Sequence, residues 1–156
     1  MLAWQACNIR AVPSPGGRHD RRVDMLGSPG FFAVDELTAA KIMLDAQSDG
    51  KRVFCFPGHI SSKAQFFDGV RATFPLDPPL HGYHSWDALA DSLWSGLEGL
   101  QEEDIVIVWR GSRHMQMQAE EDFAIALDIL HDLPGALADV ALTVNQPKKL
   151  LVLQVV

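Results

Sequence analysis

The chain has 156 residues, 47% of them hydrophobic and 21% charged, which is an ordinary composition for a globular protein of one domain. No stretch approaches the roughly 18 consecutive apolar residues of a membrane-spanning helix, and this excludes an integral membrane protein. The 13 basic and 20 acidic residues give a net charge of −7. Such a balance argues against direct binding of nucleic acid, because phosphate binding depends on clustered Lys and Arg.

The negative charge is concentrated in one part of the chain. Residues 72–108 contain seven carboxylates and neither Lys nor Arg, whereas residues 1–26 hold four arginines against two aspartates. An acidic block of this kind either maintains solubility or attracts a positively charged partner. The elements predicted below decide where these carboxylates lie.

Residues 1–30 are predicted to be a flexible leader. Pro and Gly are frequent over residues 13–30, and such a segment cannot bury enough apolar surface to offset the entropy that it loses on ordering. Met25 is an alternative start site, in which case the first 24 residues are not native. A basic tail that binds an acidic partner is the other interpretation of this segment.

The cysteines and the N-terminal sequence bear on the cellular compartment. Cys7 and Cys55 show no metal-ligand spacing and are too few for a disulfide framework. Met1 to Arg10 contain no continuous apolar stretch long enough for a secretory signal. We therefore expect a cytoplasmic protein.

The first half of the chain becomes regular from about Val34. Apolar spacing, turn residues and capping residues predict a helix, a short buried strand, a second helix and a proline-rich loop. These elements are expected over Asp35–Gln47, Arg52–Phe56, Ser61–Phe74 and Pro75–His84, in that order.

The second half begins with the clearest helix in the chain. A β-branched run, typical of a strand buried on both faces, follows it, and a further helix and two candidate strands come after that. The predicted ranges are Ser85–Leu100, Asp104–Trp109, Gln116–Leu133, Val140–Val144 and Leu150–Val156, with Pro134-Gly135 expected to stop the last helix.

This order of elements predicts an α/β fold. We expect a small parallel sheet of about three strands, joined by right-handed crossovers and packed by helices. Residues 31–50 are expected to add a helix in front of the main domain, which spans residues 51–156.

The helix predicted from Ser85 presents two different sides. An apolar stripe should face the core, and it consists of Trp86, Leu89, Leu93, Leu97 and Leu100. Asp87 and Asp91 lie four residues apart on another side, where like charges cost an isolated helix roughly 0.2–0.5 kcal/mol. No Lys or Arg is close in sequence, so an Arg-rich or Lys-rich partner can neutralise this acidic edge through charge-assisted contacts.

Three interpretations of the two aspartates remain open on these residues alone. The simplest is a solvated helix face. The second is a binding edge for a cationic site on another protein. The third is a metal-binding or acid/base pair of an enzyme, which needs a concave pocket and further functional groups that the sequence does not visibly supply.

The segment from Tyr83 to Leu93 carries a family resemblance. Its sequence, Tyr-His-Ser-Trp-Asp-Ala-Leu-Ala-Asp-Ser-Leu, resembles the signature of the barstar family, the intracellular protein inhibitors of guanyl-preferring microbial ribonucleases. The order of the surrounding elements is also similar, including a strand that ends in Trp109-Arg110. The resemblance covers residues 51–156 and implies a barstar-like fold for them.

The resemblance implies an inhibitor without enzymatic activity or cofactor. In the family, the acidic helix and the preceding loop block the basic active site of the ribonuclease by imitating phosphates. Asp87 and Asp91 match the two family aspartates. Asp91 is then expected to be the main anchor, pairing with Arg and His groups of the enzyme, and Asp87 to contact its substrate-recognition side.

Other candidate contacts lie beside these aspartates. Tyr83 and His84 fall in the loop, and Trp94 and Ser95 fall on the helix; for Tyr83 and Trp94, packing in the core is the competing expectation. His81 and His84 have no third ligand in register, so we expect no metal site. The family also uses an acidic residue of its last helix, for which Asp128 and Asp132 are the candidates.

Several positions depart from the family pattern. Tyr83 stands at the family's Gly, Ser85 stands at its Asn, and His81-Gly82 replace its aromatic pair. These departures concern the identity of the partner more than the fold. The expected partner is a ribonuclease or nuclease-type toxin with a basic active site, and the alternative is an interaction or immunity module for a different basic protein.

Overall fold

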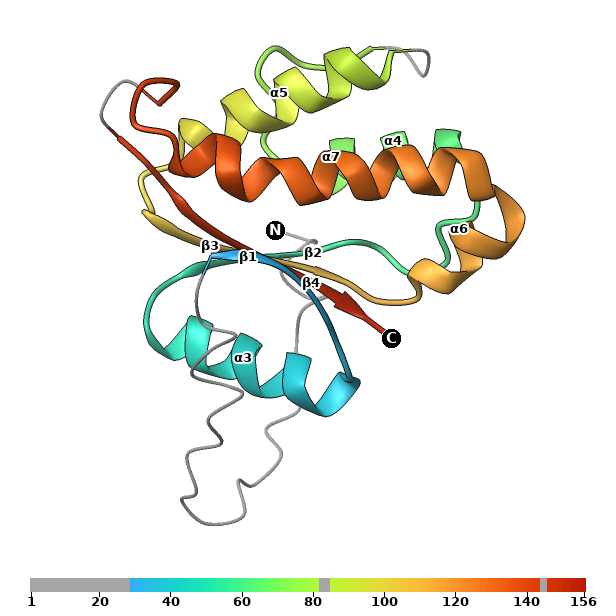
Figure 1. Ribbon diagram of the computed structural model, residues 1–156, viewed down its shortest axis with the longest axis horizontal. Coiled ribbons are helices and arrows are strands. Elements are labelled where there is room, and N and C mark those ends of the chain that lie inside the picture. Colours follow the sequence, from blue (N-terminus) through green and yellow to red (C-terminus); the bar gives the residue numbers. More distant parts are fainter. Residues whose placement is uncertain (1–28, 82–84, 144–145) are drawn as a thin grey trace.

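The computed structural model describes residues 29–81, 85–143 and 146–156. In these ranges the chain alternates strands and helices, all shown in Figure 1. In chain order they are β1 (Gly30–Val34), α3 (Glu36–Ser48), β2 (Arg52–Cys55), α4 (Lys63–Thr73), α5 (Trp86–Glu98), β3 (Asp104–Trp109), α6 (Ser112–Gln118), α7 (Glu120–Ala138) and β4 (Lys149–Val155).

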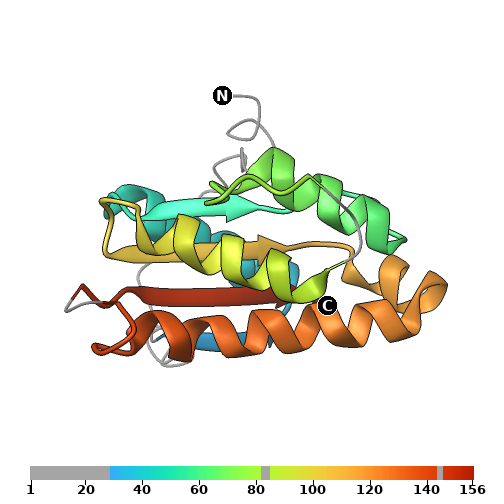
Figure 2. The ribbon, with the colours of Figure 1, turned by 90° about the horizontal axis from the view of Figure 1, so that it is seen from above.

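The strands form one parallel sheet in the order β1-β4-β3-β2. Helices α4, α5 and α7 cover one face of the sheet, and α3 covers the other (Figures 1 and 2). The connection from β1 to β2 therefore passes on one side of the sheet, while those from β2 to β3 and from β3 to β4 pass on the other. Every strand that lies inside the sheet is consequently apolar on both faces.

The larger core lies under α4, α5 and α7 and is rich in aromatic side chains. Trp109, at the end of β3, is 1% exposed. Its ring centre lies 5.2 Å from that of Phe56, 5.4 Å from that of Phe66 and 5.7 Å from that of Phe123. Aromatic side chains bury the most apolar surface per residue, so this cluster anchors two helices to the sheet.

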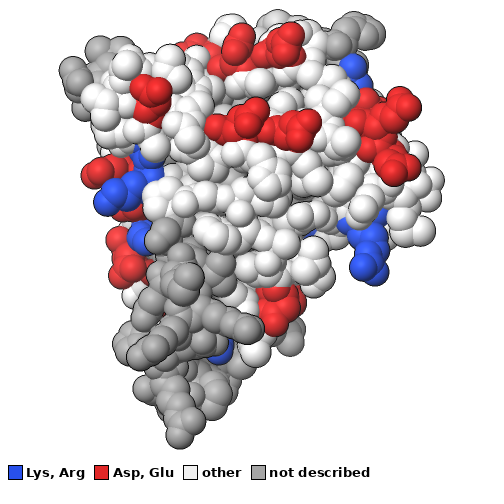
Figure 3. All heavy atoms as spheres, in the orientation of Figure 1, with Lys and Arg blue, Asp and Glu red and all other residues white. Residues whose placement is uncertain are grey.

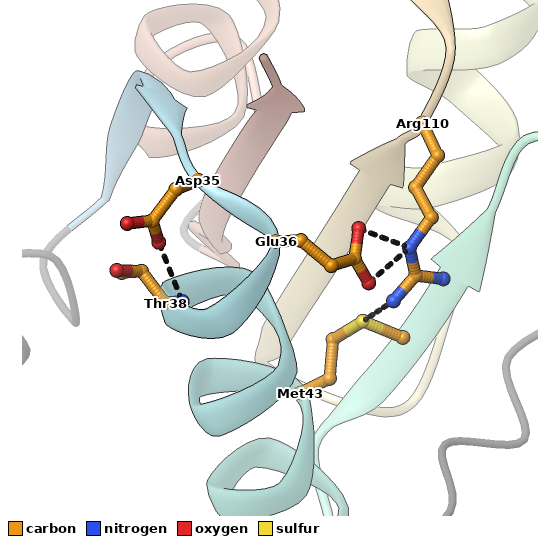
Figure 4. A network of polar contacts seen from close by, with 5 residues as sticks. All are labelled: Asp35, Glu36, Thr38, Met43 and Arg110. Carbon is orange, nitrogen blue, oxygen red and sulfur yellow. Dashed lines mark hydrogen bonds and ion pairs between the residues drawn. The ribbon is translucent and has the colours of Figure 1, made fainter.

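The smaller core lies under α3 and is mainly aliphatic. Ile42 and Met43 of α3 pack against Val106, Val108 and Leu153 of the sheet. At the start of α3, Arg110 donates from Nε to both carboxylate oxygens of Glu36, at 2.9 and 3.0 Å (Figure 4). The Arg110 Nη2 group also lies 3.5 Å from the sulfur of Met43, so the end of β3 is tied to α3.

Capping side chains set the start of three helices. Asp35 Oδ1 accepts from the backbone N–H of Thr38 at 2.7 Å, and Ser62 and Ser85 accept likewise at 3.1 and 3.0 Å. Each bond satisfies one N–H group that has no partner within the helix. Ser62 and Ser85 lie at the start of the helices predicted over Ser61–Phe74 and Ser85–Leu100, and both helices are confirmed.

The predicted fold class, α/β with a parallel sheet, is confirmed, but the sheet has four strands where about three were expected. The additional strand is β1, whose residues the sequence analysis assigned to the end of the leader and to the additional helix. This strand is short and pairs with β4, more than a hundred residues later, as in Phe31 opposite Val152. Local pattern carries no information about such a distant partner.

Two further predictions were wrong. Val140–Thr143 form turns and not a strand, because Asp139 Oδ1 accepts from the N–H groups of Ala141 and Leu142; Val144 lies outside the described residues. Pro134 does not end α7, which continues to Ala138. Pro134 is itself buried, as are Leu133 and Leu137, and this burial holds the final turns despite the lost N–H donor.

The helix predicted over Gln116–Leu133 is divided in two. α6 ends at Gln118 and α7 begins at Glu120, with a non-helical backbone at Ala119 between them. Among the helices that the structure describes, none is long and apolar enough to cross a membrane.

Candidate protein-binding site

Helix α5 is fixed to the core by the apolar stripe that its sequence predicts. Leu89, Leu93 and Leu97 are all fully buried. Trp86, at the first position of the helix, is half-buried and packs against Phe66 and Phe67 of α4, with ring centres 5.6 and 5.1 Å apart. These contacts define which side of α5 remains available to a partner.

Asp87 and Asp91 lie on the side of α5 that faces solvent, and both are exposed. Neither carboxylate makes a hydrogen bond or an ion pair with any residue that the structure describes. The predicted acidic edge is therefore present on the surface and is not neutralised within the described chain. A carboxylate in this state can accept charge-assisted hydrogen bonds from Arg or Lys of another molecule.

Trp94 and Ser95 border the two aspartates on the same helix, and both are half-buried. Trp94 packs against the larger core, yet its indole N–H is buried without a hydrogen-bond partner in the described structure. A partly exposed indole supplies apolar contact area next to the charged pair, which is an arrangement common at protein interfaces. Ala90, between the aspartates, is half-buried and offers only a methyl group.

The segment that leads into α5 is pinned to the helix at Gly96. A Cβ atom at Gly96 would lie 1.4 Å from the carbonyl oxygen of Pro75, so only glycine permits this approach. One turn earlier, the carbonyl of Ser92 accepts from the N–H of Asp77 at 3.1 Å. The start of the 75–85 connection is thus held against the middle of α5, a contact that the sequence analysis did not predict.

The far end of α5 is held by Lys148, which is only 5% exposed. Its ammonium group donates to the carbonyl of Leu100 and, at 2.9 Å, to that of Glu102. α5 has no basic residue in its last turn, and Lys148 places a positive charge just beyond it. Since Lys148 is remote in sequence, local pattern could not assign it this position.

A second row of carboxylates runs beside the first. Figure 3 shows acidic side chains in two rows, one over α5 and one over α7, with no basic side chain between the rows. Asp128 and Asp132 of α7 are both exposed. Three more acidic residues occupy the first turn of α7, namely Glu120, Glu121 and Asp122. The two helices therefore present one acidic face.

One basic residue borders this face. Lys63, at the start of α4, places its ammonium 5.6 Å from the ring centre of Trp86 and 5.8 Å from that of Phe67. Attraction between the ammonium and the two rings holds the Lys63 side chain beside Trp86, the residue that precedes Asp87. The local sequence pattern does not indicate this contact of Lys63 with the two rings.

Tyr83 and His84 lie outside the described residues, and His81 is exposed. Within the described ranges, no group of three or more His, Cys, Asp or Glu side chains is placed to hold a metal ion.

The family model described as "Barstar (barnase inhibitor)" matches residues 52–148, which is more than half of the chain. This range contains α4, α5, β3, α6 and α7, and hence both acidic rows. A search of the curated proteins found no match, and a search of the solved structures found none.

Proposed function

Because the chain belongs to the barstar family, we propose that it inhibits a ribonuclease by placing the acidic edge of α5 in the basic active site of the enzyme. The protein acts by binding, without chemistry of its own and without a cofactor. Its partner is a secreted-type or toxin ribonuclease, and the inhibitor resides in the cytoplasm.

The observation that carries this proposal is the state of Asp87 and Asp91. Both are exposed on one rigid helix, and the described chain gives neither of them a partner. Ribonuclease active sites hold phosphates with Arg, Lys and His, so a pair of carboxylates at fixed spacing can occupy the same positions. Asp91 is proposed as the main anchor and Asp87 as the contact to the substrate-recognition side.

The packing of α5 lowers the entropic cost of this recognition. The buried leucines, Gly96 and Lys148 hold the helix before the partner arrives, so few backbone groups need to be ordered on binding. Trp94 and Ser95 are proposed as neighbouring contacts, as are Tyr83 and His84 from the loop. The half-buried indole of Trp94 supplies the apolar part of the contact.

The second acidic row extends the electrostatic effect. Asp128 and Asp132 on α7 add negative potential to the same face that α5 presents (Figure 3). A field of one sign increases the rate of association with an oppositely charged partner, and salt screens it. We propose that one of these two residues also contacts the enzyme.

A titration against a panel of guanyl-specific ribonucleases tests the proposal. We expect tight inhibition of at least one enzyme, weakened by added salt, and loss of that inhibition in Asp91→Ala. Asp45→Ala is the matched control, since Asp45 is an exposed aspartate on α3, which packs on the opposite face of the sheet. If no ribonuclease in the panel is inhibited while a basic protein is recovered by pull-down through Asp91, the chain is an interaction or immunity module for that protein.

A further inference from the structure

Two histidines that the proposed function does not use lie together at the carboxyl edge of the sheet. His59 follows β2, and His114 belongs to α6, which follows the neighbouring strand β3. Their ring centres are 5.5 Å apart and the ring planes are inclined by 60°. Both residues are exposed, and neither imidazole makes a hydrogen bond or an ion pair with the described residues.

The backbone on both sides of this pair adopts unusual conformations. His59 has a φ of 66°, in the left-handed region that few residues other than glycine adopt. Gly111, which caps α6, has a φ of 70°, and a Cβ there would lie 3.5 Å from Cδ2 of His114. Two left-handed residues in adjacent strand-to-helix turns thus bring the rings together.

The separation of the rings matches that of two imidazoles that share one metal ion. A metal–nitrogen bond of about 2.0–2.1 Å puts the metal about 3.2 Å from each ring centre. At a tetrahedral angle, two such rings have their centres about 5.2 Å apart. The observed 5.5 Å differs from this by a few tenths of an ångström, so the ring separation is compatible with one shared ion.

We propose that His59 and His114 bind one divalent transition-metal ion such as Zn²⁺, with water in the remaining coordination positions. Imidazole is the preferred side-chain ligand for Zn²⁺, Ni²⁺ and Cu²⁺, and an exposed pair is accessible to the ion. The described residues supply no third protein ligand, so the site is open. The ion links the turn after β2 to α6 and stabilises the folded chain by an amount that grows with the free Zn²⁺ concentration relative to its Kd.

Titration of the full-length chain with Zn²⁺ alone tests this proposal by calorimetry and by thermal unfolding. We expect one ion per chain and an unfolding midpoint that rises with Zn²⁺ concentration and returns to its starting value with EDTA. His59→Asn keeps a residue that tolerates the left-handed backbone and removes the imidazole. His59→Asn and His114→Gln should each lower the affinity at least about 10-fold, because each removes one of two ligands.

The pair is distinguished from other histidines by two comparisons. His81→Gln, at an exposed histidine elsewhere, should leave Zn²⁺ binding unchanged, and the His59→Asn/His114→Gln double variant, which keeps neither ligand, should not bind Zn²⁺ at this site. Circular dichroism checks that each variant is folded. Wild-type affinity in either single variant, persistence of the bound ion in the double variant, or failure of the wild-type chain to bind Zn²⁺ overturns the proposal.

Discussion

Helices α3 and α5 are both 13 residues long, begin at a capping side chain and carry an acidic residue in the first turn. They use their negative charge in different ways. In α3, Glu36 is bound through both carboxylate oxygens by Arg110 from the end of β3. In α5, Asp87 and Asp91 have no hydrogen-bond or ion-pair partner in the described structure.

An acidic helix therefore acquires its role from its tertiary neighbours. α3 lies beside the end of a strand that supplies a guanidinium, so its first-turn carboxylate helps to attach the helix. α5 lies in a stretch of sequence without Lys or Arg, and the nearby ammonium of Lys63 lies against the rings of Phe67 and Trp86. Its carboxylates are consequently left for another molecule.

The largest expected effect is on ribonuclease binding, which should depend on the aspartates of α5 and not on those of α3. The Asp87→Ala/Asp91→Ala double variant should lose at least the 2–5 kcal/mol, roughly 30-fold to several thousandfold, that removal of one partner from a buried charge pair costs. Asp45→Ala on α3 should leave inhibition unchanged. Inhibition constants at fixed ionic strength measure both. Equal losses in the two variants would mean that net charge, and not position, determines binding.

The next largest effect is on the free energy of unfolding, which a substitution in α3 should lower without changing inhibition. Met43 of α3 is fully buried against the sheet, so Met43→Ala should lower the free energy of unfolding by about 2–5 kcal/mol. Inhibition per folded molecule should not change, because α3 packs on the opposite face from α5. Urea unfolding measures the free energy of unfolding, and titration of the ribonuclease active sites with the variant measures inhibition per folded molecule. A folded Met43→Ala variant that no longer inhibits would contradict the division between the helices.

A smaller effect on stability is expected at Gly96, where the backbone of Pro75 lies against α5. Gly96→Ala places a methyl group on the carbonyl of Pro75, and overpacking of this kind costs about 1–3 kcal/mol or more. Gly135→Ala is the matched control in α7, where nothing lies within 4 Å of the added methyl, and it should stabilise by roughly 0.5–1 kcal/mol. Thermal unfolding compares the pair. Equal stability of the two variants would show that Pro75 does not press on the helix.

The smallest effects should have opposite signs. Asp91→Asn removes repulsion from Asp87 and should raise the free energy of unfolding by roughly 0.2–0.5 kcal/mol, although inhibition is lost. Glu36→Gln weakens a contact whose carboxylate side chain is 61% exposed, and should lower it by at most about 1 kcal/mol. Chemical unfolding in low salt resolves these changes. Destabilisation by Asp91→Asn would show that this carboxylate has a partner within the chain.

Elements with strong local periodicity could be predicted, together with the side of α5 that carries the aspartates. The leucine spacing of α5 predicts a helix that is buried on one face. The β-branched run Asp104–Trp109 predicts a strand that is buried on both faces, and the structure has both elements. The strand β1 could not be predicted, because its partner is the last strand of the chain. Nor could Gly96 and Lys148, whose roles depend on chain segments that meet only in the folded protein.

The position of β4 has a consequence for how the molecule is made. β4, the last of the described strands in chain order, lies between β1 and β3, and the N–H of Val156 donates to the carbonyl of Val34. The sheet cannot be completed before β4 has been synthesised, so β1, β2 and β3 remain without their full sheet until then. Loss of residues 149–156 would divide the sheet in its middle, because β1 and β3 pair only through β4.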